Sequence, residues 1–305
     1  MILKRHLDPL LCRLWGRHWD AVARAEARSA LGWGAALTAL ALALTAWAGA
    51  VLALTFAEDF RTAAAVARGI VSAGWFLALA VNASHLQKMF VLDNRLGVTE
   101  AWLLTSAPRE DLLWSRLAGR CAGGPLTVLL MAPVYVLGAM GLDGRQYPLF
   151  VLGHVARMAS VWPLPGGGGP GAWLGALPVG LAAAAGDALL VAALSPGSLA
   201  TALLNVNRRR FWSDFARSFL QGTGLHLRVL AMSMLALLGE TLLGTVAGLV
   251  AWAGEGLPAA ARTLAGLALA APIAAAAAAV RLRLMRWNVR AAADHYDAIM
   301  LEDAP

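Results

Sequence analysis

The sequence predicts an all-α integral membrane protein with six transmembrane helices, an N-terminal interfacial amphipathic helix and a short cytoplasmic helix between spans two and three. Three observations support this fold class. Hydrophobic residues make up 59% of the 305 residues and charged residues only 14%, whereas a soluble domain carries about 25% charged residues. Six apolar runs are long enough to cross a bilayer. The basic residues gather in every second connection between these runs.

The six apolar runs define a transmembrane domain over residues 31–284. A helix of about 20 residues crosses a hydrocarbon core of about 30 Å, and a helix satisfies its own backbone hydrogen bonds in lipid. The second run is the least regular, because polar residues from Asn82 to Lys88 interrupt its C-terminal half. The predicted spans cover residues 31–56, 69–90, 118–142, 172–194, 225–252 and 257–284.

The distribution of Lys and Arg predicts that both termini lie in the cytoplasm. The N-terminus, the second and fourth connections and the C-terminal tail together hold twenty of these residues, whereas the opposite side holds five. Such a bias marks the cytoplasmic side of a membrane protein. The net charge of +7 is therefore a matter of topology, and nucleic acid is not expected as a partner.

The two ends of the chain and the third connection are expected to be peripheral. Leucines and tryptophans recur at helical spacing within residues 1–30, which predicts a helix lying in the cytoplasmic interface; a disordered basic arm is the alternative. Residues 285–305 form the cytoplasmic tail, and the arginines from Arg281 onward are expected at anionic headgroups. The connection 143–171 is expected to hold a short re-entrant or surface helix before a flexible glycine run.

The segment between spans two and three is charged and contains helix signals. Gly97 is expected to break the preceding helix, and residues 98–105 place Val98, Ala101 and Trp102 on one helical face. Pro108 then favours a restart, where Glu110 and Asp111 complement the helix dipole. The pattern predicts a short amphipathic helix, a tight corner and a second helix rising into the third span.

This segment resembles the cytoplasmic segment between the second and third spans of ABC-2-type transporter permeases. That family commonly reads E-R-E-x-G-T-L-E-x-L-L-x-T-P, followed after a few residues by I-L-x-G-K. The matching positions over about 28 residues are Asp93, Gly97, Glu100, Leu103, Thr105, Leu112, Leu113 and Arg116, the last in place of the lysine. The departures are Asn94, Arg95, Val98, Thr99, Ser106 and Ser115.

The resemblance implies the membrane permease subunit of an ATP-driven exporter in the bacterial inner membrane. It implies a partner ABC ATPase subunit that binds the ATP, and a second permease subunit forming a homo- or heterodimer. The sequence contains no G-x-x-x-x-G-K-[ST] phosphate loop, so no cofactor and no enzymatic activity are expected in this chain. The expected ATPase-coupling residues are Asp93, Gly97, Glu100, Trp102, Thr105, Glu110 and Arg116.

Two intramembrane carboxylates support an alternative function. Asp187 lies in the fourth predicted span and Glu240 in the fifth, and a carboxylate in hydrocarbon must face the bundle interior, a cavity or a partner. They could act as a proton relay in a stand-alone secondary transporter or an integral-membrane enzyme. They could equally be hydrogen-bonded groups that hold helices together, with Thr241 or Thr245 near Glu240. The histidines and cysteines show no metal-ligand spacing, so no metal is expected.

Overall fold

A computed structural model describes residues 33–95, 108–120, 123–152, 172–206, 227–228, 230–244, 246, 256 and 258–301. The described elements are all helical. Four long helices run along the molecule: α3 (Trp33–Phe56), α4 (Phe60–Arg95), α11 (Ala172–Val206) and α13 (Ala259–Leu301). The shorter elements are α6 (Arg109–Arg120), α7 (Gly123–Leu130), α8 (Ala132–Met140), the 3-10 turn η2 (Gly144–Gln146), α9 (Tyr147–Leu152) and an apolar helix Leu230–Gly244.

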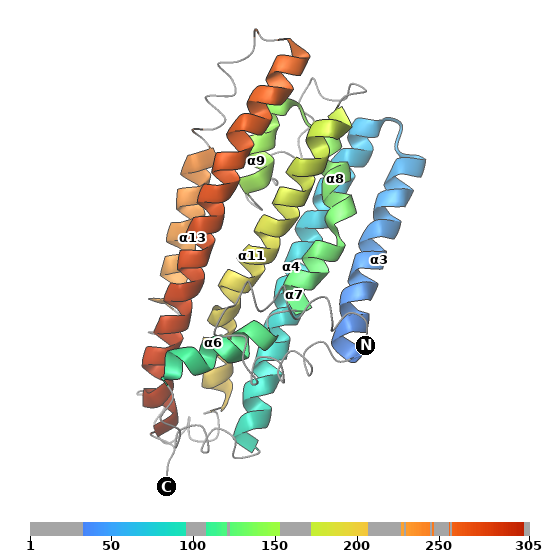
Figure 1. Cartoon of the computed structure of the whole chain (residues 1–305). Coiled ribbons are helices and arrows are strands. Elements are labelled where there is room, and N and C mark those ends of the chain that lie inside the picture. The colour runs from blue at the N-terminus through green and yellow to red at the C-terminus, as the bar shows by residue number, and fades with distance from the viewer. Residues whose placement is uncertain are drawn as a thin grey trace, which may run out of the picture.

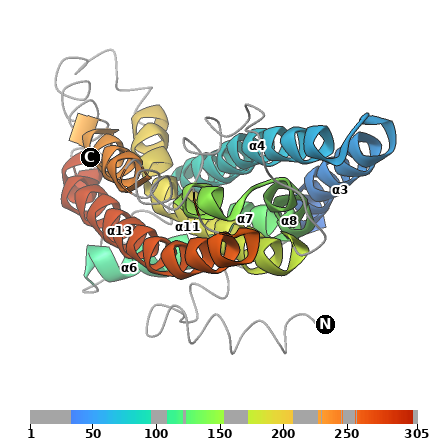
Figure 2. The same ribbon diagram turned by 90° about the horizontal axis from the view of Figure 1, so that it is seen from above.

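The long helices form a bundle with α11 at its centre. α11 packs against α13, α4, α8, α7 and α9, and α7 and α8 follow one another along the bundle beside α4 (Figures 1 and 2). α4, α11 and α13 all end at the end of the bundle where α6 lies, here called the α6 end (Figure 1). The α3–α4 turn and α9 lie toward the opposite end, here called the α9 end.

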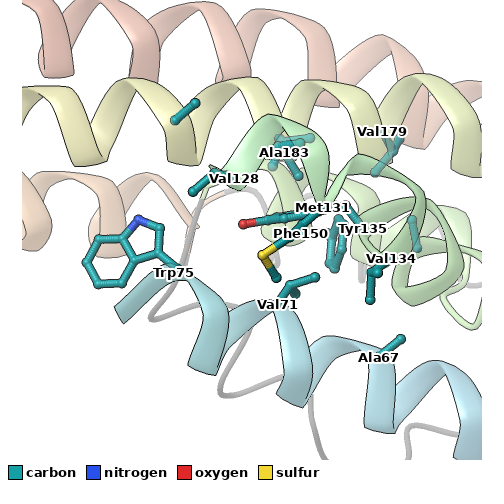
Figure 3. Close-up of a cluster of buried hydrophobic side chains, with 14 of the residues drawn as sticks. Ala67, Val71, Trp75, Val128, Met131, Val134, Tyr135, Phe150, Val179 and Ala183 are labelled. Atoms are coloured by element: carbon teal, nitrogen blue, oxygen red, sulfur yellow. The ribbon is translucent and has the colours of Figure 1, made fainter. Parts of the chain in front are cut away.

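The core is built largely from small side chains. Met131, Tyr135 and Val134 of the α7–α8 region meet Val71 and Trp75 of α4 in a buried cluster (Figure 3). Gly74 leaves the space that the Met131 side chain occupies. Likewise, a Cβ at Gly180 of α11 would stand 2.6 Å from the Cα of Val136. Small residues let helix backbones approach closely, which is how helices associate in lipid, where apolar side chains alone give little preference for one another.

The outer surface of the bundle is apolar. Large hydrophobic side chains are exposed along α3, along the Leu230–Gly244 helix and on parts of α4 and α13, among them Leu37, Leu44, Val51, Phe76, Leu235, Leu242 and Leu264. A surface of this kind is unfavourable in water and matches a hydrocarbon environment. Together with the long apolar helices, it indicates a membrane-embedded, multi-pass protein.

The described residues do not include all six predicted spans as complete helices. Within the described part of the chain, four helices are long and apolar enough to cross a membrane, namely Leu37–Phe56, Phe60–Asn82, Gly175–Ser195 and Ala260–Asp294, and the bent pair α7–α8 can make a fifth. The described Leu230–Gly244 helix is shorter than a crossing requires, and the rest of the predicted fifth span lies outside the described residues. The N-terminal segment 1–30 also lies outside them. α13 continues as a helix through most of the predicted tail, to Leu301.

The third predicted span, 118–142, is wrong at its start and is broken in its middle. Residues 118–120 belong to α6, and the apolar helices begin only at Gly123. α7 and α8 meet at an angle of 44°. Pro133 in the first turn of α8 has no N–H to donate and clashes with the preceding turn. Proline at this position therefore favours a break between α7 and α8.

Trp47 of α3 satisfies a carbonyl group that this break leaves free. The N–H of Val134 donates to the carbonyl of Met131 at 2.9 Å, whereas in an α-helix it would donate to Leu130. The indole Nε1 of Trp47 instead donates to the Leu130 oxygen at 2.9 Å. An unpaired backbone carbonyl is costly in lipid, so this bond stabilises the kink and ties α3 to it.

The α9 end is closed by a tight turn. Asp143 caps η2 in a reciprocal box with Gln146, and its Oδ2 lies 3.0 Å from the Nε of Arg145 and 3.6 Å from an Nη of Arg262 in α13. Burial raises the pKa of the following Tyr147, and the Asp143 charge adds to that rise. At the neighbouring α3–α4 turn, hydrogen bonds from the side chain and backbone of Thr62 lower the pKa of Asp59.

Candidate functional site: a buried polar network around α11

Glu240 and Arg281 form a buried ion pair between the Leu230–Gly244 helix and α13. The Nε of Arg281 donates to one carboxylate oxygen of Glu240 at 2.7 Å, and an Nη donates to the other at 2.8 Å. The Arg281 side chain is only 1% exposed and the Glu240 side chain 7%. A bidentate, charge-assisted pair of this kind is the strongest polar contact available to two side chains.

Arg281 also reaches the last residue of α9. The Nη that contacts Glu240 donates a second hydrogen bond to the backbone carbonyl of Leu152. The last carbonyls of a helix have no partner within the helix, so Arg281 satisfies one of them inside the bundle. The short helix predicted for the connection 143–171 is present as α9, and all its described side chains except that of Leu149 are buried, against α11 and α13.

Gly186 of α11 makes room for the Arg281 guanidinium. A Cβ at this position would lie 2.7 Å from an Nη of Arg281. Glycine here lets the charged group approach the α11 backbone, so the ion pair involves three helices and α9. The residue that follows on α11 is Asp187, which places the two predicted intramembrane carboxylates in the same region of the bundle.

Asp187 is fully buried and is bound by α8. The hydroxyl of Tyr135 donates to the Asp187 Oδ2 at 2.7 Å, and neither residue has any exposed surface. Tyr135 also belongs to the apolar cluster between α8, α4 and α11 (Figure 3). The bond therefore joins the polar network to the core of the bundle.

Two further polar contacts hold α11 nearer the α6 end. The Nδ2 of Asn82 in α4 donates to the hydroxyl of Ser195, which itself donates to the Val191 carbonyl. On α13, the Nδ2 of Asn288 donates to the Ala193 carbonyl at 3.1 Å. These contacts bind α4 and α13 to the same turn of α11.

The structural role considered for Glu240 agrees with this geometry, but the partner and the placement of Arg281 were predicted wrongly. The Glu240 carboxylate binds Arg281, while the hydroxyl of Thr241 donates to the Leu237 carbonyl of its own helix; Thr245 lies outside the described residues. Arg281 was expected at headgroups and is instead buried. A carboxylate in a span needs a cation or another polar partner, but the sequence does not say which helix supplies it.

α6 lies across the end of the bundle at which α4, α11 and α13 also end (Figures 1 and 2). Its buried face carries Leu113, Trp114 and Leu117 and packs on α13 and α4. Its acidic first turn is partly exposed, and the Glu110 Oε1 lies 3.3 Å from the Nε of Arg290 in α13. The sequence predicted a helix rising into the membrane here; the structure shows a transverse helix because the strongly amphipathic sequence has one apolar face only.

The predicted coupling residues are only partly within the described chain. Glu110 is on the partly exposed turn of α6, whereas Arg116 is buried, with 3% exposure, and so is not available as a surface contact. Asp93 lies in the last turn of α4. Gly97, Glu100, Trp102 and Thr105 lie outside the described residues. Among the residues that are described, no three His, Cys, Asp or Glu side chains gather as a metal site would require.

The chain was compared with protein-family models, with curated proteins and with solved structures. None of them matches it. Function must therefore be argued from the geometry of this chain and from the resemblance of its segment 93–116.

Proposed function

We propose that this chain is the permease subunit of an ABC-2-type transporter, in the bacterial inner membrane, and that a separate ATPase subunit drives it through α6 and the segment before it. The observation that carries the proposal is α6 itself. It is an amphipathic helix lying across the end of the bundle, with its apolar face on α13 and α4 and its acidic first turn partly exposed. Only two residues separate it from α7.

In this arrangement a movement of α6 would be transmitted to the long helices of the bundle. A partner that binds the partly exposed first turn of α6 would apply force to α7 through the chain and to α13, against which α6 packs. The ion pair between Arg290 and Glu110 adds a second connection to α13. Packed helices move as rigid bodies when such an element is displaced. α11 would then be the fixed centre, because buried polar contacts hold α4, α8 and α13 to it.

The stand-alone transporter or enzyme receives less support. A proton-relay carboxylate must be able to bind and release a proton, and Glu240 is instead held by two donors of one guanidinium. The proposal therefore assigns Glu240 a role in holding helices together, and export by a dimer of such subunits remains part of the proposed function.

The test is a charge reversal in the partly exposed first turn of α6. The tagged full chain is purified from its native membrane with its bound partners, and co-purifying ATP hydrolysis is measured for wild type, Asp111→Lys and Glu58→Lys. Glu58 is an exposed carboxylate in the α3–α4 turn, at the opposite end of the bundle. We expect Asp111→Lys to lower ATPase activity by about ten-fold or more, because a reversed charge opposes a complementary partner surface, and Glu58→Lys to leave it unchanged.

Two results would contradict the proposal. One is a wild-type chain that brings no ATPase activity with it. The other is an Asp111→Lys variant that folds normally and retains full activity. A matching unfolding temperature for the two variants is the control that separates loss of a partner from loss of the fold.

A further inference from the structure

Arg68 of α4 is also buried, and it has no carboxylate partner among the residues the structure describes. Its side chain is 3% exposed, and its Nη1 donates to the backbone carbonyl of Gly138 at 3.0 Å. Its Nε has no acceptor. An arginine stays charged in proteins, and a buried charge is normally paired. Arg281 obeys this rule through Glu240, whereas Arg68 has only a carbonyl.

Ser72 adds an unused donor on the same face of α4. It lies four residues after Arg68, so the two side chains are neighbours along the helix. Its hydroxyl is buried and has no hydrogen-bond partner. Serine and threonine in helices commonly donate to the carbonyl four residues earlier, and this chain does so elsewhere, at Thr45, Thr55, Ser115, Thr127, Ser195 and Thr241. Ser72 does not.

The surroundings of Arg68 leave room for its head group near the α9 end. A Cβ at Gly141, the residue after α8, would lie 3.2 Å from the Arg68 Nη1. The guanidinium therefore lies beside the last turn of α8. The dipole of α8 supplies at most about half a negative charge there, so a net positive charge remains.

One flank of this pair is open. Gly69 follows Arg68 and is exposed, and a Cβ at Gly69 would meet nothing within 4 Å. Ala65, on the same flank, is small and half-buried. Small residues therefore border Arg68 on this side of α4.

We propose that Arg68 and Ser72 form a binding site for a phosphate-bearing anion. A phosphate oxygen can accept hydrogen bonds from a guanidinium and from a hydroxyl at the same time, which satisfies both unused donors and the charge. The phosphate can come from an anionic lipid headgroup or from a soluble ion. This site is independent of α6 and of the proposed coupling to an ATPase.

The test measures thermal unfolding of the purified full chain in two arms. In the first, delipidated protein in neutral detergent is titrated with inorganic phosphate replacing chloride at constant ionic strength. In the second, the protein is placed in nanodiscs of phosphatidylcholine with or without phosphatidylglycerol. A ligand that binds only the folded state raises the unfolding temperature in a saturable way. A response in the first arm identifies a soluble ion and a response in the second identifies a lipid headgroup.

Three variants and one control sharpen the result. Arg68→Met is expected to raise the half-saturating ligand concentration about ten-fold or more, because a charge-assisted contact is lost, and to melt above wild type when no ligand is present. Ser72→Ala is expected to raise the half-saturating ligand concentration by a smaller factor. Gly69→Leu, at an exposed position, keeps both donors but blocks the open flank, and should also weaken binding. Arg61→Met, at an exposed arginine of the same helix, should respond as wild type does.

The proposal fails if wild type responds to neither phosphate nor phosphatidylglycerol. It also fails if Arg68→Met melts below wild type under every condition, since Arg68 would then serve only to cap α8. Unchanged binding by Gly69→Leu would exclude entry along this flank. Should Arg68→Met not fold, the Ser72→Ala and Gly69→Leu titrations decide the matter.

Discussion

Arg281→Met is expected to lower the free energy of unfolding by about 3–5 kcal/mol. The variant leaves the Glu240 carboxylate buried without its cation and the Leu152 carbonyl without its donor. Neither group can turn toward water, because both lie inside the bundle. The measurement is unfolding of the purified chain in mixed micelles with increasing denaturing detergent, followed by the loss of helical signal in circular dichroism.

Two companion variants make this result specific. Arg283→Met removes an exposed arginine from the same turn of α13 and should change stability by less than about 1 kcal/mol. The double variant Arg281→Met with Glu240→Leu removes both charges, and it should recover most of the loss, because apolar residues of similar size can replace a buried ion pair at little cost. A single variant as stable as Arg283→Met would show that the pair does not hold the helices together.

Gly266→Ala is expected to lower the free energy of unfolding by about 1–3 kcal/mol or more. A Cβ at Gly266 of α13 would overlap the carbonyl oxygen of Gly144, and a Cβ at Gly144 would stand 2.5 Å from the Arg262 carbonyl oxygen. Both obstacles are backbone atoms, which cannot rotate aside. The α9 end of the bundle must therefore separate from α13 to accept even one methyl group.

The same substitution at an open helical glycine provides the control. A Cβ at Gly239 would meet nothing within 4 Å, so Gly239→Ala should be neutral or stabilising by up to about 1 kcal/mol, because alanine is the better helix former. The same detergent titration measures both variants. Equal stabilities for Gly266→Ala and Gly239→Ala would contradict the close backbone contact between η2 and α13.

The fold class and the long helices could be predicted because apolar runs of this length have few alternatives in a chain so poor in charge. The cores of the first, second, fourth and sixth predicted spans coincide with the four helices that can cross a membrane. The helix ends were harder to place. Pro133 breaks the third predicted span. The segment after Pro108 forms a helix that lies across the bundle, because an amphipathic helix is more stable at a surface than in lipid.

Only part of the buried polar network could be predicted from the sequence. Asp187 and Glu240 could be singled out because carboxylates are rare in apolar runs. Their partners could not, because hydropathy does not say which helices are neighbours. Arg281 was assigned to a boundary for this reason, since an arginine after an apolar run looks the same whether it lies among headgroups or reaches a glutamate in another helix. Gly186 gave no signal either, because its role is to leave space for Arg281.

The side of the membrane on which α6 lies is the central claim, since an ATPase can act on α6 only from the cytoplasm. The direct measurement uses Asp111→Cys in a chain whose Cys12 and Cys121 are changed to serine, with Glu58→Cys as the opposite-end reference. Right-side-out and inside-out membrane vesicles are treated with a membrane-impermeant maleimide. The account predicts labelling of Asp111→Cys only in inside-out vesicles and of Glu58→Cys only in right-side-out vesicles. Labelling of Asp111→Cys from the outer side would contradict it.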